Sequence, residues 1–167
     1  MAVSTHYLRF STGGNADIID ITDGVSDALS KSGLSGGTAT IFAPGATGAV
    51  TTIEYESGLI SDLKDMLERI APQNTRYAHN LKWGDGNGHS HVRAALLGPS
   101  LSVPFSGGRM QLGGSLVIRV AHICTVSHYK TKPLSCASIG GKSEEVKSRS
   151  EKLWIGRRKI FLYKVTM

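Results

Sequence analysis

Short β-favouring runs that end at glycine- or proline-containing turns make up most of this 167-residue chain. They constrain the fold more than any other feature, because strands of this length need several neighbours to bury one face. The expected helices lie between groups of strands without regular β-α alternation. The sequence therefore predicts an α+β fold, a compact single domain with a largely antiparallel sheet and two to three helices. We expect strands at 7–10, 17–21, 38–42, 49–56, 101–105, 110–112 and 116–126.

The clearest single element is a helix from Gly58 to Ala71, which Pro72 ends. Its apolar residues recur at helical spacing, and we expect this stripe to lie in the core. A shorter helix is expected between Thr22 and Gly33. The runs 7–10 and 17–21 flank a Gly-Gly-Asn turn that suits a hairpin or short meander, and 101–105 is expected to form a hairpin with 110–112.

Three of the six histidines, His79, His89 and His91, lie within thirteen residues around a glycine-rich turn. His89 and His91 can approach one cation only if the backbone between them is extended or irregular, because a helix would turn them about 200° apart. We therefore expect the next helix to begin at Ser90, after His89, and to end at Gly98.

Two interpretations of this histidine segment stay open. Imidazole nitrogens suit zinc or a similar metal, and the amides at a helix N-terminus favour an anion such as phosphate. The alternative is a hydrophilic turn with exposed histidines. A calcium loop of the EF-hand type is disfavoured, because a loop starting at Asp85 would need an acidic ligand where Leu96 stands.

Charge is unevenly distributed along the chain. The net charge is +6, but residues 1–113 hold 8 Lys/Arg against 10 Asp/Glu, whereas residues 114–167 hold 11 against 3. A basic segment of this kind can bind nucleic acid through phosphate contacts. The two cysteines have no metal-binding spacing. The start resembles no secretory signal and no apolar run approaches the roughly 20 residues that span a bilayer, so we expect a cytoplasmic protein with no membrane contact.

The last part of the chain differs in character from the rest. Residues 127–150 are polar and basic, which is typical of a linker or a flexible extension. Residues 153–163 are aromatic and apolar again, and three outcomes are open for them: packing on the domain, pairing as an added strand, or contacting partners. We expect a domain over 1–126 and a basic C-terminal extension over 127–167.

Several motifs together resemble the YjbQ family, whose members include secondary thiamine-phosphate synthases. They are Asp20-Ile21-Thr22, 44–56, Tyr77-Ala78-His79-Asn80, Asn87-Gly88-His89-Ser90-His91, Leu97-Gly98-Pro99-Ser100 and 107–113. The resemblance covers about residues 5–113, and the C-terminal third departs from the family. Many members also have His-Thr-Thr where this chain has Gly45-Ala46-Thr47.

The resemblance implies a compact α+β homotrimer with a histidine-bearing site near subunit boundaries. It implies that the chain joins aminopyrimidine-methyl pyrophosphate to thiazole phosphate and releases pyrophosphate. His79, His89 and His91 are then the metal or phosphate ligands, with Glu54 and Thr47 lining the site. The expected cofactor is a divalent metal ion, zinc or magnesium.

Further roles complete this hypothesis. His89 and Glu54 are candidate catalytic residues, and Arg93 is either a phosphate contact or an ordinary surface arginine. Asn87 and Gly88 are candidate cofactor-binding residues beside Thr47. The expected partners are other copies of the chain and small phosphorylated metabolites. Two alternatives stay open: a metal-assisted phosphohydrolase, and a metal- or ligand-binding assembly protein whose basic end contacts nucleic acid, although nucleic-acid binding is not favoured.

Overall fold

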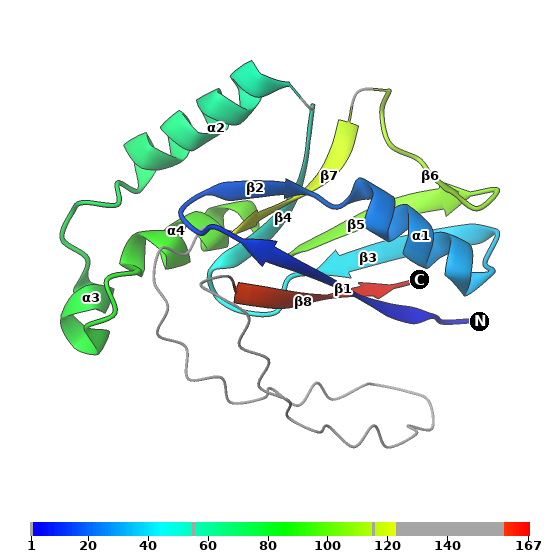
Figure 1. Cartoon of the computed structure of the whole chain (residues 1–167), viewed down its shortest axis with the longest axis horizontal. Helices are drawn as coiled ribbons and strands as arrows, with labels where there is room; N and C mark the ends of the chain where they lie inside the picture. Colours follow the sequence, from blue (N-terminus) through cyan, green and yellow to red (C-terminus); the bar gives the residue numbers. More distant parts are fainter. Residues whose placement is uncertain (1, 55, 115, 123–158) are drawn as a thin grey trace.

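The computed structural model describes residues 2–54, 56–114, 116–122 and 159–167 (Figure 1). They form an α+β fold with two sheets, ordered β1-β8-β3-β5-β6 and β2-β7-β4. Every strand pair in them is antiparallel, as the sequence predicts. The strands are β1 (Thr5–Thr12), β2 (Asp17–Asp20), β3 (Gly36–Phe42), β4 (Gly48–Glu54), β5 (Ser100–Ser106), β6 (Arg109–Met110), β7 (Leu116–His122) and β8 (Lys159–Thr166).

Four helices accompany the sheets in the described residues: α1 (Thr22–Ser32), α2 (Ser57–Ile70), α3 (Ala78–Trp83) and α4 (Gly88–Leu97). The predicted helices correspond to α1, α2 and α4. The six-residue α3 was not expected, because so short a segment shows no apolar periodicity. None of the helices in the described ranges is long and apolar enough to cross a membrane.

Strand β8 occupies the interior of the larger sheet. It pairs with β1 along its whole length, from Thr5 opposite Thr166 to Thr12 opposite Lys159. Its last three residues also pair with β3. Residues 159–166, which the sequence predicts to be part of the extension, thus pair within the larger sheet. Of the three outcomes considered for this end of the chain, an added strand is the one that the structure shows. Residues 123–158, which include the end of the predicted strand 116–126 and the polar segment 127–150, lie outside the described residues.

The prediction of an N-terminal hairpin is wrong. β1 and β2 follow each other along the chain, yet β1 pairs with β8 and β2 pairs with β7 in the other sheet. In the connecting turn Gly14, Asn15 and Ala16 all have positive φ, and the Asp17 carboxylate accepts hydrogen bonds from Gly13 N–H and Thr12 Oγ1. This turn sends the chain into a different sheet. The second expected hairpin is confirmed, because Phe105 pairs with Met110 in β5 and β6.

The main core lies between α1 and the larger sheet. α1 contributes Val25, Ala28 and Leu29, which pack with β3, β5 and the chain end at Met167. Gly33 ends α1 in the left-handed conformation (φ 68°), as its position in the sequence predicts. The helix therefore covers one face of the sheet and holds the C-terminal strand in place.

α2 is less well covered than the sequence predicts. Of its apolar stripe only Leu67 is fully buried, while Leu63 and Met66 are half-buried and Ile70 is exposed. Figure 1 shows α2 standing away from the sheets. The expectation that the whole stripe is core therefore needs correction: Leu67 alone is fully buried, four residues of the stripe are covered in part, and Ile70 is open to solvent.

Candidate metal centre

The junction between α3 and α4 brings three ligand-type side chains together. Gly84 ends α3 in the left-handed conformation and Gly86 repeats it, so the chain folds back within four residues. Asn80 Oδ1 then accepts a hydrogen bond of 2.8 Å from Gly88 N–H, which ties the start of α4 to α3. A Cβ atom at position 88 would lie 2.6 Å from Tyr77 Cβ. Gly88 is therefore required by packing at this junction.

The cluster itself consists of His79, Asp85 and His91. One ligand atom of each lies within 4.8 Å of the others. His79 Nε2 is 3.4 Å from Asp85 Oδ2, and the rings of His79 and His91 have centroids 4.3 Å apart. All three side chains are half-buried, so they are fixed by packing and still reachable from solvent. Two imidazoles and one carboxylate form a donor set that binds divalent metals.

The electrostatics of the cluster fit a cation. Burial lowers the pKa of His91, the neighbouring His79 lowers it further, and Asp85 opposes the shift. The lowered pKa favours the neutral form of His91, the form in which imidazole ligates a metal. Within the described part of the chain, the buried Asp85 Oδ1 has no hydrogen-bond partner. A bound cation would satisfy this oxygen, whose burial otherwise costs free energy.

His89 does not join the cluster. α4 begins at Gly88, two residues earlier than expected, so His89 lies in its first helical turn and points to the opposite side from His91. It is fully buried, shares a hydrogen bond of 3.2 Å with Ser90 Oγ and lies beside Tyr77. Burial, followed by the nearby Arg93 charge, lowers the pKa of His89. Asp85, for which the sequence predicts no ligand role, is the third member of the donor set instead of His89.

A sequence signal for Asp85 does exist. His79, Asp85 and His91 are spaced six residues apart, and the glycines at 84 and 86 allow the backbone to reverse around the aspartate. The spacing of the histidines alone does not point to Asp85, because this carboxylate lies in the turn between them. The turn and the two outer histidines are the better signal.

Arg93 anchors two helices. It is 1% exposed, which corrects the alternative of a surface arginine. Its Nε donates a hydrogen bond of 2.9 Å to the carbonyl of Ala71, and its Nη2 pairs with Glu68. These contacts fasten the C-terminal end of α2 to α4. The backbone N–H of Gln73 and the Arg93 guanidinium lower the pKa of Glu68, against the opposing effect of burial.

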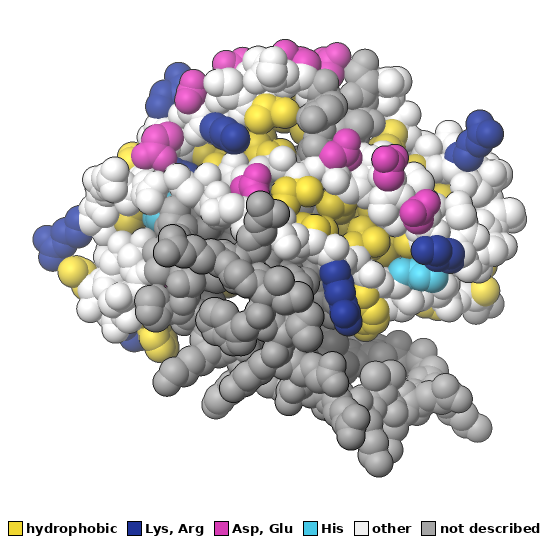
Figure 2. Space-filling view, viewed as in Figure 1, with side chains coloured by type: hydrophobic (Ala, Val, Ile, Leu, Met, Phe, Trp, Pro, Cys, Tyr) yellow, Lys and Arg dark blue, Asp and Glu magenta, His cyan; other side chains and the backbone are white. Residues whose placement is uncertain are grey.

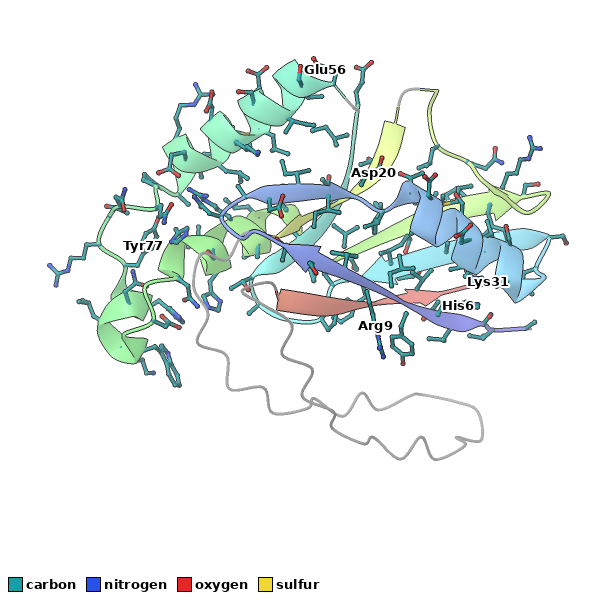
Figure 3. All side chains as sticks on the ribbon, viewed as in Figure 1. His6, Arg9, Asp20, Lys31, Glu56 and Tyr77 are labelled. Atoms are coloured by element: carbon teal, nitrogen blue, oxygen red, sulfur yellow. The ribbon has the colours of Figure 1, made fainter. Side chains whose placement is uncertain are left out.

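Thr47 and Glu54 lie at opposite ends of β4, so the structure does not bring them together. Thr47 is buried just before β4, whereas Glu54 is exposed as its last residue. Seven residues of extended strand span about 23 Å. α2 then leads from Glu56 to the loop before Tyr77, and Figure 3 shows these two residues at opposite ends of that helix. A single chain therefore cannot line one small site with both Thr47 and Glu54.

The N-terminus of α4 is less open to an anion than expected. Gly88 N–H is bonded to Asn80, and the amides of Ser90 and His91 both donate to the carbonyl of Asn87. Asn87 is buried and makes no side-chain cap, and its Oδ1 has no partner among the residues described. These amides organise the junction, and the histidine-aspartate cluster is its open chemical feature.

Comparisons with known proteins give a consistent picture. A family model described as UPF0047 protein YjbQ-like matches residues 6–124. A UPF0047 protein of Methanothermobacter thermautotrophicus is 42% identical over 113 residues, covering 68% of this chain and 78% of the relative. A UPF0047 protein of Bacillus subtilis is 31% identical over 107 residues, covering 64% and 79%.

Solved structures agree. An uncharacterised conserved protein of the YjbQ/UPF0047 family from Clostridium acetobutylicum has a TM-score of 0.66 and 28% identity, covering 71% of this chain and 90% of that chain. A protein of unknown function from Sulfolobus solfataricus has a TM-score of 0.73 over 99% of this chain and 97% of that chain. Its 22% identity makes it a likeness of fold alone.

Proposed function

Since the chain belongs to the YjbQ (UPF0047) family, we propose that it is a metal-dependent enzyme of the secondary thiamine-phosphate synthase type. The observation that carries this proposal is the cluster of His79, Asp85 and His91 at the α3–α4 junction. The proposed reaction forms a bond between the thiazole nitrogen and the pyrimidine methylene carbon. The bond from that carbon to pyrophosphate breaks, and pyrophosphate leaves with the electron pair.

His79, Asp85 and His91 would hold the metal ion. Their two nitrogens and one carboxylate suit zinc better than magnesium, which prefers oxygen ligands and retains water. When bound, the ion supplies a Lewis acid that stabilises the charge developing on pyrophosphate. The neutral His91 keeps its electron pair for ligation, and the Asp85 carboxylate offsets part of the ion's charge. His89, Arg93 and Gly88 act as positioning residues that fix α4 against α2 and α3.

The same proposal includes a homotrimer, a cytoplasmic location and small phosphorylated metabolites as ligands. Support for self-association comes from the incompletely covered stripe of α2. Because Glu54 is separated from the cluster within one chain, a role for it would need the Glu54 of another copy. Nucleic-acid binding is not favoured.

Zinc binding tests the centre directly. Protein stripped with a chelator is titrated with Zn²⁺ by calorimetry, and His91→Ala and Asp85→Asn are each expected to weaken binding at least about tenfold, because each removes a ligand. His6→Ala is the matched control, since His6 lies on β1 and bonds to Ser4. Unchanged zinc affinity in both cluster variants would contradict the assigned centre.

Product analysis tests the reaction. The zinc-loaded protein is incubated with aminopyrimidine-methyl pyrophosphate and thiazole phosphate, and thiamine phosphate is measured by mass spectrometry. We expect the unchanged protein to form thiamine phosphate and the Asp85→Asn variant to form none. Release of phosphate from simple phosphate esters without thiamine phosphate would instead identify the metal-assisted phosphohydrolase, which the same donor set also suits.

A further inference from the structure

Trp83 lies in the open beside the metal centre. It is the last residue of α3 and 68% of its surface is exposed. It follows His79 by four residues, so the two side chains share one face of the helix. Their ring centroids are 6.5 Å apart and their planes differ by 31°. With His79 and His91 in contact, three aromatic rings lead in series from the candidate metal ligands to the surface.

A positive charge accompanies this indole. Lys82 Nζ lies 5.9 Å from the centroid of the Trp83 ring. Within the described residues Lys82 forms no ion pair, since the ion pairs found there are His79 with Asp85 and Arg93 with Glu68. The rim of the centre thus offers a flat π surface, a cation without an ion pair to any described residue and, when loaded, a metal ion. An anion attached to a planar ring would match all three.

We propose that Trp83 and Lys82 form a subsite beside this centre, in which the indole stacks on the ring of the proposed substrate and the ammonium group binds its phosphate groups. The inference rests on the proposed function, because it takes the neighbouring cluster to be a metal centre. The heterocycle stacks on the exposed indole of Trp83, which accepts any flat ring with little dependence on its hydrogen-bonding groups. The phosphate groups lie toward Lys82 and the metal centre, so ring and anion are held from two sides.

The test separates ring recognition from anion recognition. Zinc-loaded, full-length protein is titrated with two probes, aminopyrimidine-methyl pyrophosphate and inorganic pyrophosphate. We expect Trp83→Leu to weaken binding of the pyrimidine probe about tenfold and to leave inorganic pyrophosphate unchanged, because only the first probe can stack. Trp83→Phe keeps a ring and is expected to retain most of the affinity. Lys82→Met is expected to weaken both probes.

Leu81→Ala is the matched control, since Leu81 is equally exposed on the same helix. The chain has two tryptophans, so in a Trp154→Phe background the indole emission reports on Trp83 alone. Quenching by the pyrimidine probe and none by pyrophosphate is expected there.

Two outcomes would overturn the inference. One is a Trp83→Leu variant that binds both probes as the unchanged protein does. The other is a variant that changes only the oligomeric state, which would mean that a second copy covers the indole. Zinc affinity is measured on the same samples, so normal zinc binding with either outcome contradicts this inference alone. Absence of zinc binding in the unchanged protein contradicts the proposed function.

Discussion

At the scale of single residues, the α3–α4 junction depends on the close approach of the Gly88 backbone to the side chains of Tyr77 and Asn80. Tyr77 packs directly on the Cα of Gly88, and Asn80 holds its N–H. Tyr77 directly precedes the short helix that carries His79 and Asn80, so the spacing of the side chains in the proposed metal centre depends on this contact. Packing against Tyr77 therefore explains why position 88, a candidate cofactor-binding residue, is a glycine.

Gly88→Ala is expected to lower the free energy of unfolding by about 1–3 kcal/mol, because the added methyl group would lie 2.6 Å from Tyr77 Cβ. Urea denaturation followed by circular dichroism measures the effect. Gly114→Ala is the control, since a Cβ there meets no atom within 4 Å. Equal stability of the two variants would mean that the junction relaxes freely.

At the scale of elements, one ion pair links α2 to α4. Arg93 is buried and pairs with Glu68, and it also donates to the carbonyl at the end of α2. The other contacts of α2 come from its apolar stripe, of which Leu67 alone is fully buried. The Glu68 carboxylate therefore contributes to the position of the loop that leads to α3.

Glu68→Gln is expected to destabilise the protein by about 1 kcal/mol at pH 7, a modest value because Glu68 is half exposed to solvent. The pKa of Glu68 is lowered from 4.5 in the folded protein. Its contribution is therefore complete above pH 4.5 and is lost as the pH falls through the lower folded-state value.

Thermal unfolding of Glu68→Gln and the unchanged protein, measured from pH 7 to pH 3, should show a difference that shrinks in acid. Asp65→Asn serves as the control, because Asp65 is an exposed carboxylate on the same helix. A difference that stays constant with pH would argue against an ionic contribution.

At the scale of the whole molecule, the helix α2 keeps an apolar face that a single chain covers only in part. Leu63 and Met66 are half-buried and Ile70 is exposed, whereas Figure 2 shows acidic side chains gathered over the outer side of α2. An amphipathic helix gains most of its stability from packing of its apolar face. We therefore expect the proposed homotrimer to bury this face between copies of the chain.

Ile70→Glu is expected to shift the protein from trimer to monomer in sedimentation equilibrium, because a carboxylate would be buried without a partner in the interface. Folding of the single chain should be retained, since Ile70 is exposed there. Val3→Glu alters another exposed apolar residue, near the N-terminus, and should leave the proposed trimer intact. A trimer that tolerates Ile70→Glu would place the interface elsewhere.

Local pattern alone determined the class of the fold, most of its elements and the segment that bears the candidate site. The helix ends at Gly33 and Gly98, the strands and the β5–β6 hairpin all follow from spacing and turn residues, which act within a few positions of the chain. The same spacing identified His79 and His91 as members of the candidate site.

Only the tertiary structure decided which strands pair and which side chains meet. β1 pairs with β8 at the far end of the chain instead of with β2, because alternation of apolar residues specifies a face and not a partner. α4 begins two residues earlier than the sequence predicts. Because His89 is therefore helical, its side chain lies in the interior, and Asp85 lies beside the two other histidines. Such choices depend on packing between distant segments, which short-range pattern does not encode.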